Sequence, residues 1–383
     1  MGILPKCFGF SGSKHTSSSH HMNKYSTQIE ELCHRFSLAQ LQKSTNNFND
    51  SRKIGRGGFG YVYKACICIQ GIAKEIAIKR FSRDSIQAFS EFQNEIELLC
   101  QLRHPNLVSL IGFCFEKDEK IIVYEYMANG SLHDHLVNKI TVPLPWKRRV
   151  EICIGAARGL HYLHSGTKRI IFHRDVKQTN ILLDQNWIPK LSDFGLSLIG
   201  PLSMSKPKPT TLDRIIGTYG YMAPEYYFNG TFSEKCDVFS FGMVLLVVVC
   251  AKDAQKIVPV DEDGSESENS YENLASKVYN LVHEGMADEI VDPFLMGKIA
   301  PKCWKVFMDI AERCLLDEPN ERPAMGEVEV ELEHALALQE EADQTNPSGD
   351  YSLLSTVAAP QPENGNQNLR FSADKNNNGA DTT

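Results

Sequence analysis

The sequence lacks an excess of positive charge, because its 40 Lys and Arg residues are outnumbered by 48 Asp and Glu residues. Proteins that bind nucleic acid generally present a basic face, so a net charge of -8 argues against a nucleic-acid partner. The sequence also lacks a long apolar run. Its longest, residues 241–251, has about half of the roughly 20 residues that a membrane-spanning helix needs. We therefore expect no transmembrane span, and the polar residues 11–24 argue against a signal peptide.

No two of the 11 cysteines have the Cys-x-x-Cys spacing of a metal knuckle. The cysteines are scattered and odd in number, and several lie in apolar runs, as Cys100 and Cys114 do. Cys66 and Cys68 are two residues apart, the spacing of neighbours on one face of a strand. These features indicate free thiols in a reducing, cytoplasmic setting.

The order of local patterns predicts two lobes of different kinds. Residues 54–126 contain short runs rich in Val, Ile and Tyr, interrupted by one helical pattern at about residues 86–102. The last two runs, 107–114 and 121–126, flank a charged turn and predict a hairpin. After residue 131 helical patterns dominate. A small sheet lobe followed by a larger helical lobe is an α+β arrangement. We expect a variable tail at 1–35, an adjoining segment at 36–47, the small lobe at 48–127, the large lobe at 128–340 and a disordered polar tail at 341–383.

The small lobe opens with the glycine-rich segment Gly55-Arg56-Gly57-Gly58-Phe59-Gly60-Tyr61-Val62. Glycine allows backbone N–H groups to approach a polyphosphate without an intervening side chain. A tight β-turn favours the same residue type, so this segment alone leaves both interpretations open. A dinucleotide site requires a helix directly after the glycines, whereas Tyr61-Val62-Tyr63 has the pattern of a strand.

Lys79 ends an apolar strand pattern, a position where a lysine is commonly just solvated. The following helix offers it an acidic partner. On a helical projection Glu95 borders the apolar stripe that contains Phe92, whereas Glu91 and Glu97 point further away. We therefore expect Glu95 to face the sheet and to pair with Lys79, which would fix the ammonium for contact with phosphate oxygens.

The strongest pattern is the polar run His173-Arg174-Asp175-Val176-Lys177-Gln178-Thr179-Asn180, which precedes an apolar strand-like run. An ordinary turn does not require an acid, a lysine and an amide at these offsets. The segment Asp193-Phe194-Gly195 follows thirteen residues after Asn180. Asp and Asn oxygens are hard ligands suited to magnesium.

Residues 48–338 resemble the eukaryotic protein kinase family. Six motifs occur in the family's order: the glycine-rich loop, the strand lysine, the helix glutamate, the catalytic loop, Asp-Phe-Gly, and finally Ala223-Pro224-Glu225. The stretches Phe36-Ser37-Leu38 and His104-Pro105-Asn106-Leu107-Val108 are similar to those of plant receptor-like kinases, including the Pto-like and Feronia-like kinases. The lack of a span suggests a cytoplasmic member of this group. The resemblance implies the bilobal kinase fold, with residues 36–47 as a juxta-kinase segment.

The resemblance also implies the cofactors ATP and Mg²⁺, with Mn²⁺ as a substitute, bound between the lobes. Asp175 would accept the proton of the substrate hydroxyl, and Lys177 would stabilise the transferred phosphoryl group. Lys79, held by Glu95, would contact the phosphates. The metal would be held by Asn180 and Asp193. Further nucleotide contacts are expected from Ile54, Gly55, Gly57, Gly58, Phe59, Gly60, Val62, Ala77, Tyr124, Glu125, Met127 and Leu182.

Lys177, two residues after Asp175, and Thr218 follow the serine/threonine pattern of the family, in which some plant members also phosphorylate tyrosine. Arg174 indicates regulation by phosphorylation between Asp193 and Glu225, where the alternative is an unregulated flexible loop. The candidate phosphosites are Ser203, Ser205, Thr210, Thr211 and Thr218. The resemblance also implies a structural ion pair between Glu225 and Arg322.

The expected partners are protein substrates and an upstream membrane receptor kinase. Gly2 follows the initiator Met and Cys7 is available for palmitoylation, but Lys6 stands where a myristoylation signal has Ser or Thr. We expect a cytoplasmic protein, with lipid attachment to the inner face of the plasma membrane as the weaker alternative. Two rival functions are a pseudokinase-like scaffold in a receptor complex, which would lose Lys79, Asp175 or Asp193, and a small-molecule phosphotransferase.

Overall fold

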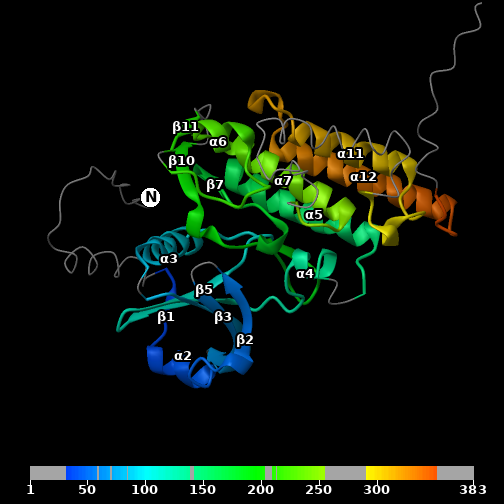
Figure 1. The fold of residues 1–383 in the computed structure, drawn as a ribbon. Helices are drawn as coiled ribbons and strands as arrows, with labels where there is room; N and C mark the ends of the chain where they lie inside the picture. Colours follow the sequence, from blue (N-terminus) through cyan, green and yellow to red (C-terminus); the bar gives the residue numbers. More distant parts are fainter. Residues whose placement is uncertain are drawn as a thin grey trace, which may run out of the picture.

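A computed structural model of the chain describes residues 32–57, 60–69, 71–83, 85–138, 142–202, 209–212, 214–254 and 290–351. Figure 1 shows a small lobe of strands, in blue and cyan, joined to a larger helical lobe. The predicted α+β, bilobal arrangement is confirmed. The link between the lobes follows β6 and includes Met127, whose carbonyl accepts the N–H of Gly130 at 3.2 Å.

The small lobe is a six-stranded sheet in the order β1-β5-β6-β4-β3-β2, in which only β1 and β5 run parallel. Its strands are β1 (His34–Arg35), β2 (Lys53–Gly57), β3 (Gly60–Ile69), β4 (Ile72–Phe81), β5 (Leu110–Glu116) and β6 (Glu119–Glu125). The predicted hairpin is β5 and β6, closed by Lys117 and Asp118 with φ of 51° and 64°, the left-handed region that two-residue hairpin turns use.

Two helices belong to the small lobe: α2 (Leu38–Ser44) and α3 (Ile86–Leu99). Helix α3 begins after Ser85, whose side chain caps the N–H of Ala88, and its buried face includes Phe92 and Glu95. It ends at Leu99, close to the predicted end at about residue 102, and the N–H of Leu102 still donates to the carbonyl of Leu98 at 3.2 Å. In Figure 1, α3 lies between the sheet and the large lobe.

The large lobe is built on helices, of which the four longest lie side by side in Figure 1. They are α4 (Leu132–Leu136), α5 (Trp146–His161), α6 (Pro224–Asn229), α7 (Glu234–Cys250), α11 (Pro301–Cys314) and α12 (Met325–Thr345). Short antiparallel pairs join β7 (Arg169–Phe172) to β10 (Leu198–Leu202), β8 (Ile181–Leu183) to β9 (Pro189–Leu191), and β11 (Thr210–Thr211) to β12 (Thr231–Phe232). Helix α7 is buried all round from Cys236 to Cys250, as expected for its apolar sequence.

The N-terminal boundary of the small lobe differs from the predicted one. His34 and Arg35, assigned to a variable tail, form β1 and pair with β5. The juxta-kinase segment 36–47 is part of a second core that covers the sheet, through Phe36, Leu38 and Leu41. The segment folds onto the lobe because its apolar side chains cover sheet residues that water would otherwise contact.

The C-terminal boundary also differs. Helix α12 continues to Thr345, five residues beyond the predicted end of the large lobe at residue 340. The continuation is anchored by Gln339, which is 1% exposed and donates to Asp343 at 2.8 Å, and by Ala342, which packs against the core. Among the described residues, none of the helices combines the length and the apolar character that a membrane crossing requires.

Candidate active site

Lys79 and Glu95 form the predicted ion pair, with Lys79 Nζ 2.9 Å from Glu95 Oε2. Lys79 lies on β4 opposite Ile122 of β6, and Glu95 projects from the buried face of α3 with 1% exposure. Nζ also lies 2.6 Å from Asp193 Oδ1. Burial disfavours the charged ammonium, but the carboxylates of Asp193 and Glu95 outweigh it and hold the pKa of Lys79 above its usual value.

The backbone of the Asp-Phe-Gly segment is held by side chains of α3. Asp193 has φ 68° and ψ 69°, which turns its carboxylate toward Lys79. The N–H of Phe194 donates to Glu95 Oε1 at 3.3 Å. Asn94 donates its amide to the carbonyls of Phe194, Gly195 and Ser197 at 3.1, 3.0 and 2.7 Å. Asn94 therefore joins α3 to this segment, a role that no sequence pattern indicated.

The orientation of Glu91 differs from the prediction. Glu91 was expected to point further from the apolar stripe than Glu95, but it is buried, with 4% exposure. It faces Gly195, where an added Cβ would lie 2.9 Å from Glu91 Cβ. Glu91 and Glu95 are four residues apart and so share a helix face. Burial raises the pKa of the Glu91 carboxyl to about 7, against smaller opposing effects of Gln87 and Lys79.

The catalytic loop is held by a buried acid on α7. Asp237, 1% exposed, accepts the N–H groups of His173 and Arg174, both at 2.8 Å. His173 in turn accepts the N–H of Asp175 at Nδ1 and donates from Nε2 to the carbonyl of Ser192. His173 therefore joins the catalytic loop to Ser192, the residue before Asp193. This contact places the predicted residues of the two motifs close together.

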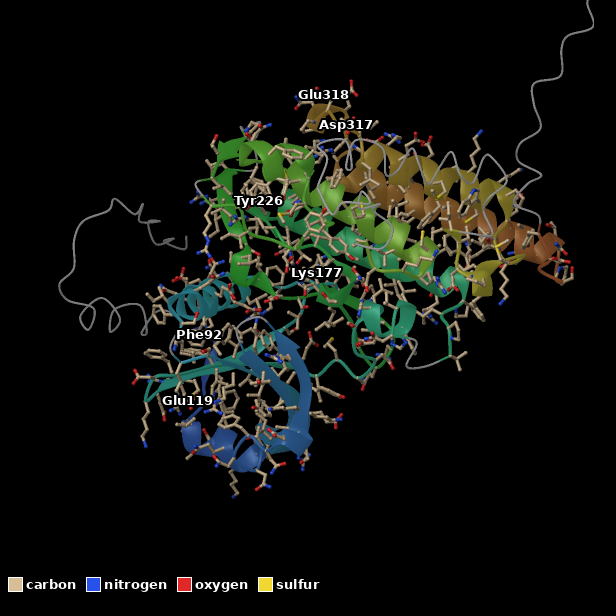
Figure 2. All side chains as sticks on the ribbon, viewed as in Figure 1. Phe92, Glu119, Lys177, Tyr226, Asp317 and Glu318 are labelled. Carbon is tan, nitrogen blue, oxygen red and sulfur yellow. The ribbon has the colours of Figure 1, made fainter. Side chains whose placement is uncertain are left out.

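Asp175, Lys177 and Thr218 form a triangle of close contacts. Lys177 Nζ lies 2.7 Å from Asp175 Oδ2 and donates to Thr218 Oγ1 at 2.7 Å, while Thr218 donates to Asp175 Oδ1 at 2.6 Å. Figure 2 shows Lys177 between the small and the large lobe. The hydroxyl of Thr218, predicted as a phosphosite, is therefore engaged by the catalytic loop. Asn180 donates to Asp175 at its carbonyl and Oδ2.

Asn180 and Asp193 fit the chemistry of a magnesium site. The amide nitrogen of Asn180 is turned toward Asp175, so its amide oxygen faces the other way. Ser192 donates from both its N–H and its hydroxyl to the carbonyl of Asn180, which ties the chain beside Asp193 to this residue. The side chain of Asp193 is 43% exposed, which leaves it accessible to a cation. Both groups offer the hard oxygens that Mg²⁺ prefers.

The residues of the glycine-rich segment that are expected to contact the nucleotide lie on two neighbouring strands, of which β3 pairs with β4 at Lys79. Ile54, Gly55 and Gly57 are on β2, and Gly60 and Val62 are on β3. Gly58 and Phe59 lie outside the described residues. An added Cβ at Gly60 would lie 2.0 Å from the carbonyl of Arg80, so glycine is required for the close approach of the strands.

The predicted adenine pocket draws on both lobes. Ala77 of β4 is opposite Tyr124 of β6, and Leu182 lies on β8. Burial and the charge of Glu95 raise the pKa of the Tyr124 hydroxyl, which keeps it neutral. The N–H of Glu125 donates to the carbonyl of Ser109 at 3.2 Å.

The remaining predicted residues lie in the large lobe. Arg322 and Glu225 form the expected pair, with bonds of 2.6 and 2.9 Å and an Arg322 side chain that is fully buried. Arg174 donates to the Leu196 carbonyl and the Tyr226 hydroxyl at 3.2 and 2.9 Å. Thr210 and Thr211 form β11 and are exposed, whereas Ser203 and Ser205 lie outside the described residues.

Comparisons with known proteins agree with this geometry. Residues 48–332 match the family model described as protein tyrosine and serine/threonine kinase. The chain is 46% identical to the receptor-like protein kinase FERONIA of Arabidopsis thaliana and 48% identical to the receptor-like protein kinase ANXUR1 of the same plant. The alignments cover 90% and 88% of the chain. They cover 37% and 38% of the relatives, so the chain spans a little over a third of their length.

Proposed function

The chain belongs to the protein tyrosine and serine/threonine kinase family, and from that premise we propose that it transfers the γ-phosphate of ATP to serine and threonine hydroxyls of protein substrates. One observation carries the proposal. Asp175 is held by Lys177 and Thr218, and the same catalytic loop is tied through Ser192 to the chain beside Asp193. This arrangement supports a phosphate donor and a hydroxyl acceptor in adjoining positions.

On the nucleotide side, Mg-ATP supplies the phosphoryl group and the charge that neutralises the phosphate oxygens. Lys79 binds and orients the phosphates, since two carboxylates keep its ammonium charged. Asp193 and Asn180 hold the metal through carboxylate and amide oxygens. Most of the rate then comes from positioning and electrostatic stabilisation.

On the acceptor side, Asp175 accepts the proton of the substrate hydroxyl, and Lys177 stabilises negative charge on the phosphoryl group. Thr218 orients the Asp175 carboxylate through its 2.6 Å hydrogen bond. Lys177, two residues after Asp175, and Thr218 follow the serine/threonine pattern of the family, which supports serine and threonine as acceptors over tyrosine. A pseudokinase scaffold, the rival function, would not require this set of contacts.

The test is phosphate transfer from radiolabelled ATP to myelin basic protein by the wild type and by Asp175→Asn. We expect the variant to lose about 10²- to 10⁴-fold in kcat, since it cannot accept the hydroxyl proton, while its affinity for Mg-ADP is retained. Lys79→Met should instead weaken nucleotide binding. A wild type that transfers no phosphate with Mg²⁺ or Mn²⁺ would establish the scaffold function instead.

We further propose autophosphorylation and an upstream receptor kinase as partner. The exposed Thr210 and Thr211 support the first, with Arg174 as the group that a phosphate would pair with. The names of the relatives support the second. The buried cysteines that the structure describes, such as Cys100 and Cys114, are free thiols, which favours the cytoplasm, with Gly2 and Cys7 as candidates for lipid attachment. Peptide mapping of the wild-type product locates the modified residues.

A further inference from the structure

Gln178 is a buried residue of the catalytic loop that the proposed mechanism does not use. It lies between Lys177 and Asn180, but it is 3% exposed. Its amide nitrogen lies 3.2 Å from His133 Nδ1 and donates to Asp253 Oδ1 at 3.3 Å. The amide nitrogen therefore has an acceptor in Asp253.

The carboxamide oxygen of Gln178 has a partner in the activation segment, the hydroxyl of Tyr221, which donates to it. Tyr221 is 6% exposed, and burial raises the pKa of its hydroxyl, so the hydroxyl remains a donor. The Tyr221 carbonyl accepts the hydroxyl of Ser240 on α7 at 2.6 Å. Tyr221 is thus held at both its main chain and its side chain.

This contact joins the catalytic loop to residues 217–222, which we call the substrate-side loop, at a second position. At the first position, Thr218 contacts both Asp175 and Lys177, at 2.6 and 2.7 Å. At the second position, Gln178 contacts Tyr221. In both segments the two points are three residues apart. The contacts at Thr218 hold one end of the substrate-side loop. At the other end Ser240 holds the main chain of Tyr221, and Gln178 holds its side chain, so that Gln178 ties the orientation of the loop directly to the catalytic loop that carries Asp175.

We propose that Gln178 is a positioning residue for the protein acceptor, which acts by holding Tyr221 and thereby the substrate-side loop at a set orientation to Asp175. The proposal rests on the proposed function, because it concerns the acceptor of the same phosphate transfer. Gln178 approaches the substrate-side loop and α4, not Lys79 or Asp193, so its effect falls on the acceptor and not on the nucleotide.

The test compares Gln178→Leu, Tyr221→Phe and the double variant of the full chain, with myelin basic protein as acceptor. Loss of one buried hydrogen bond should lower kcat/KM for the acceptor by about tenfold in each single variant. The Kd for Mg-ADP should not change. Because both substitutions remove the same contact, the double variant should be no worse than either single one.

The matched control is Gln339→Leu. Gln339 is also buried, and it accepts from the Ala300 N–H at 2.8 Å and donates to Asp343 and to the Lys298 carbonyl, far along the chain from the catalytic loop. It should lower Tm without a change in acceptor KM. Tyr221→Phe removes a single oxygen, so it remains informative should Gln178→Leu not fold.

Three results separate the hypotheses. An acceptor defect restricted to the Gln178 and Tyr221 variants, and not additive between them, supports the positioning role. Additive effects, or a change that only follows Tm as in Gln339→Leu, overturn it while the wild type remains an active kinase. A wild type that transfers no phosphate overturns the proposed function, and the positioning role with it.

Discussion

The two sides of the candidate site are held by different kinds of contact. On the small-lobe side, Lys79 is placed by ion pairs with Glu95 and Asp193, and its side chain is 16% exposed. On the large-lobe side, the catalytic loop is placed by hydrogen bonds to the buried Asp237 of α7. The small-lobe contacts join elements that are separate in the chain, β4, α3 and the segment at Asp193.

This difference has a physical consequence. Helix α7 is surrounded by apolar side chains, so its contacts are lost only when the large lobe unfolds. Lys79 and the backbone of the Asp-Phe-Gly segment are held against α3 by ion pairs and hydrogen bonds, and a polar contact can break without unfolding of the lobe. We therefore expect substitutions in the large lobe to affect stability first, and substitutions along α3 to affect activity first.

The largest effect is expected at the ion pair of Glu225 and Arg322, where the Arg322 side chain has no exposure. Glu225→Leu leaves that guanidinium buried without its carboxylate, which should lower the free energy of unfolding by about 3–5 kcal/mol. The measurement is urea unfolding followed by fluorescence. A double variant with Arg322→Met should recover part of the loss, since no buried charge remains. An unchanged urea midpoint in Glu225→Leu would show that the large lobe does not depend on this pair.

Much of the site could be predicted from the sequence, because charged residues at fixed offsets are informative. The pair of Lys79 and Glu95 followed from an apolar stripe and a strand end, and the pair of Glu225 and Arg322 followed from the family resemblance. Both are confirmed. The hairpin of β5 and β6 followed from two apolar runs with a charged turn between them.

The contacts of Asn94 and Gln178 could not be predicted in this way. Neutral amides have no periodicity, and their partners are distant in the chain, 100 residues away for Asn94 and Phe194. Two other features, the burial of Glu91 and the start of α2, could have been predicted from the sequence. The spacing of Glu91 and Glu95 already placed both on one helix face. Ser37 and Gln40 form a capping box that marks the start of α2 within the juxta-kinase segment.

A second, smaller effect is expected from Glu91 as a dependence of stability on pH. Its pKa is raised from 4.5 to about 7 in the folded chain, so the folded state binds more protons between these values and loses stability as pH rises. Glu91→Gln removes this loss. Between pH 5.5 and 8 its advantage over the wild type should grow by about 2 kcal/mol, measured by urea unfolding in EDTA without nucleotide. A constant difference between the two proteins across this range would contradict the buried, protonatable carboxyl.

The smallest free-energy change is expected at Asn94, and it should appear in activity. Asn94→Asp keeps the size of the side chain but replaces the amide donor that contacts the carbonyls of Phe194, Gly195 and Ser197. The two amide hydrogens are shared among these carbonyls, and we expect a net loss of about 0.5–1.5 kcal/mol in all. This loss should lower kcat about tenfold and raise the Mg²⁺ concentration needed for activity, because the segment that carries Asp193 loses its support.

The control for Asn94→Asp is Gln93→Ala, whose amide contacts only Glu97 of the same helix among the hydrogen bonds of the described residues. It should change neither kcat nor the Mg²⁺ requirement. The urea midpoint of Asn94→Asp should stay close to that of the wild type, in contrast to Glu225→Leu. If Asn94→Asp instead unfolds early and keeps its Mg²⁺ requirement, then α3 is part of the stable framework, and the distinction between the two sides of the site does not hold.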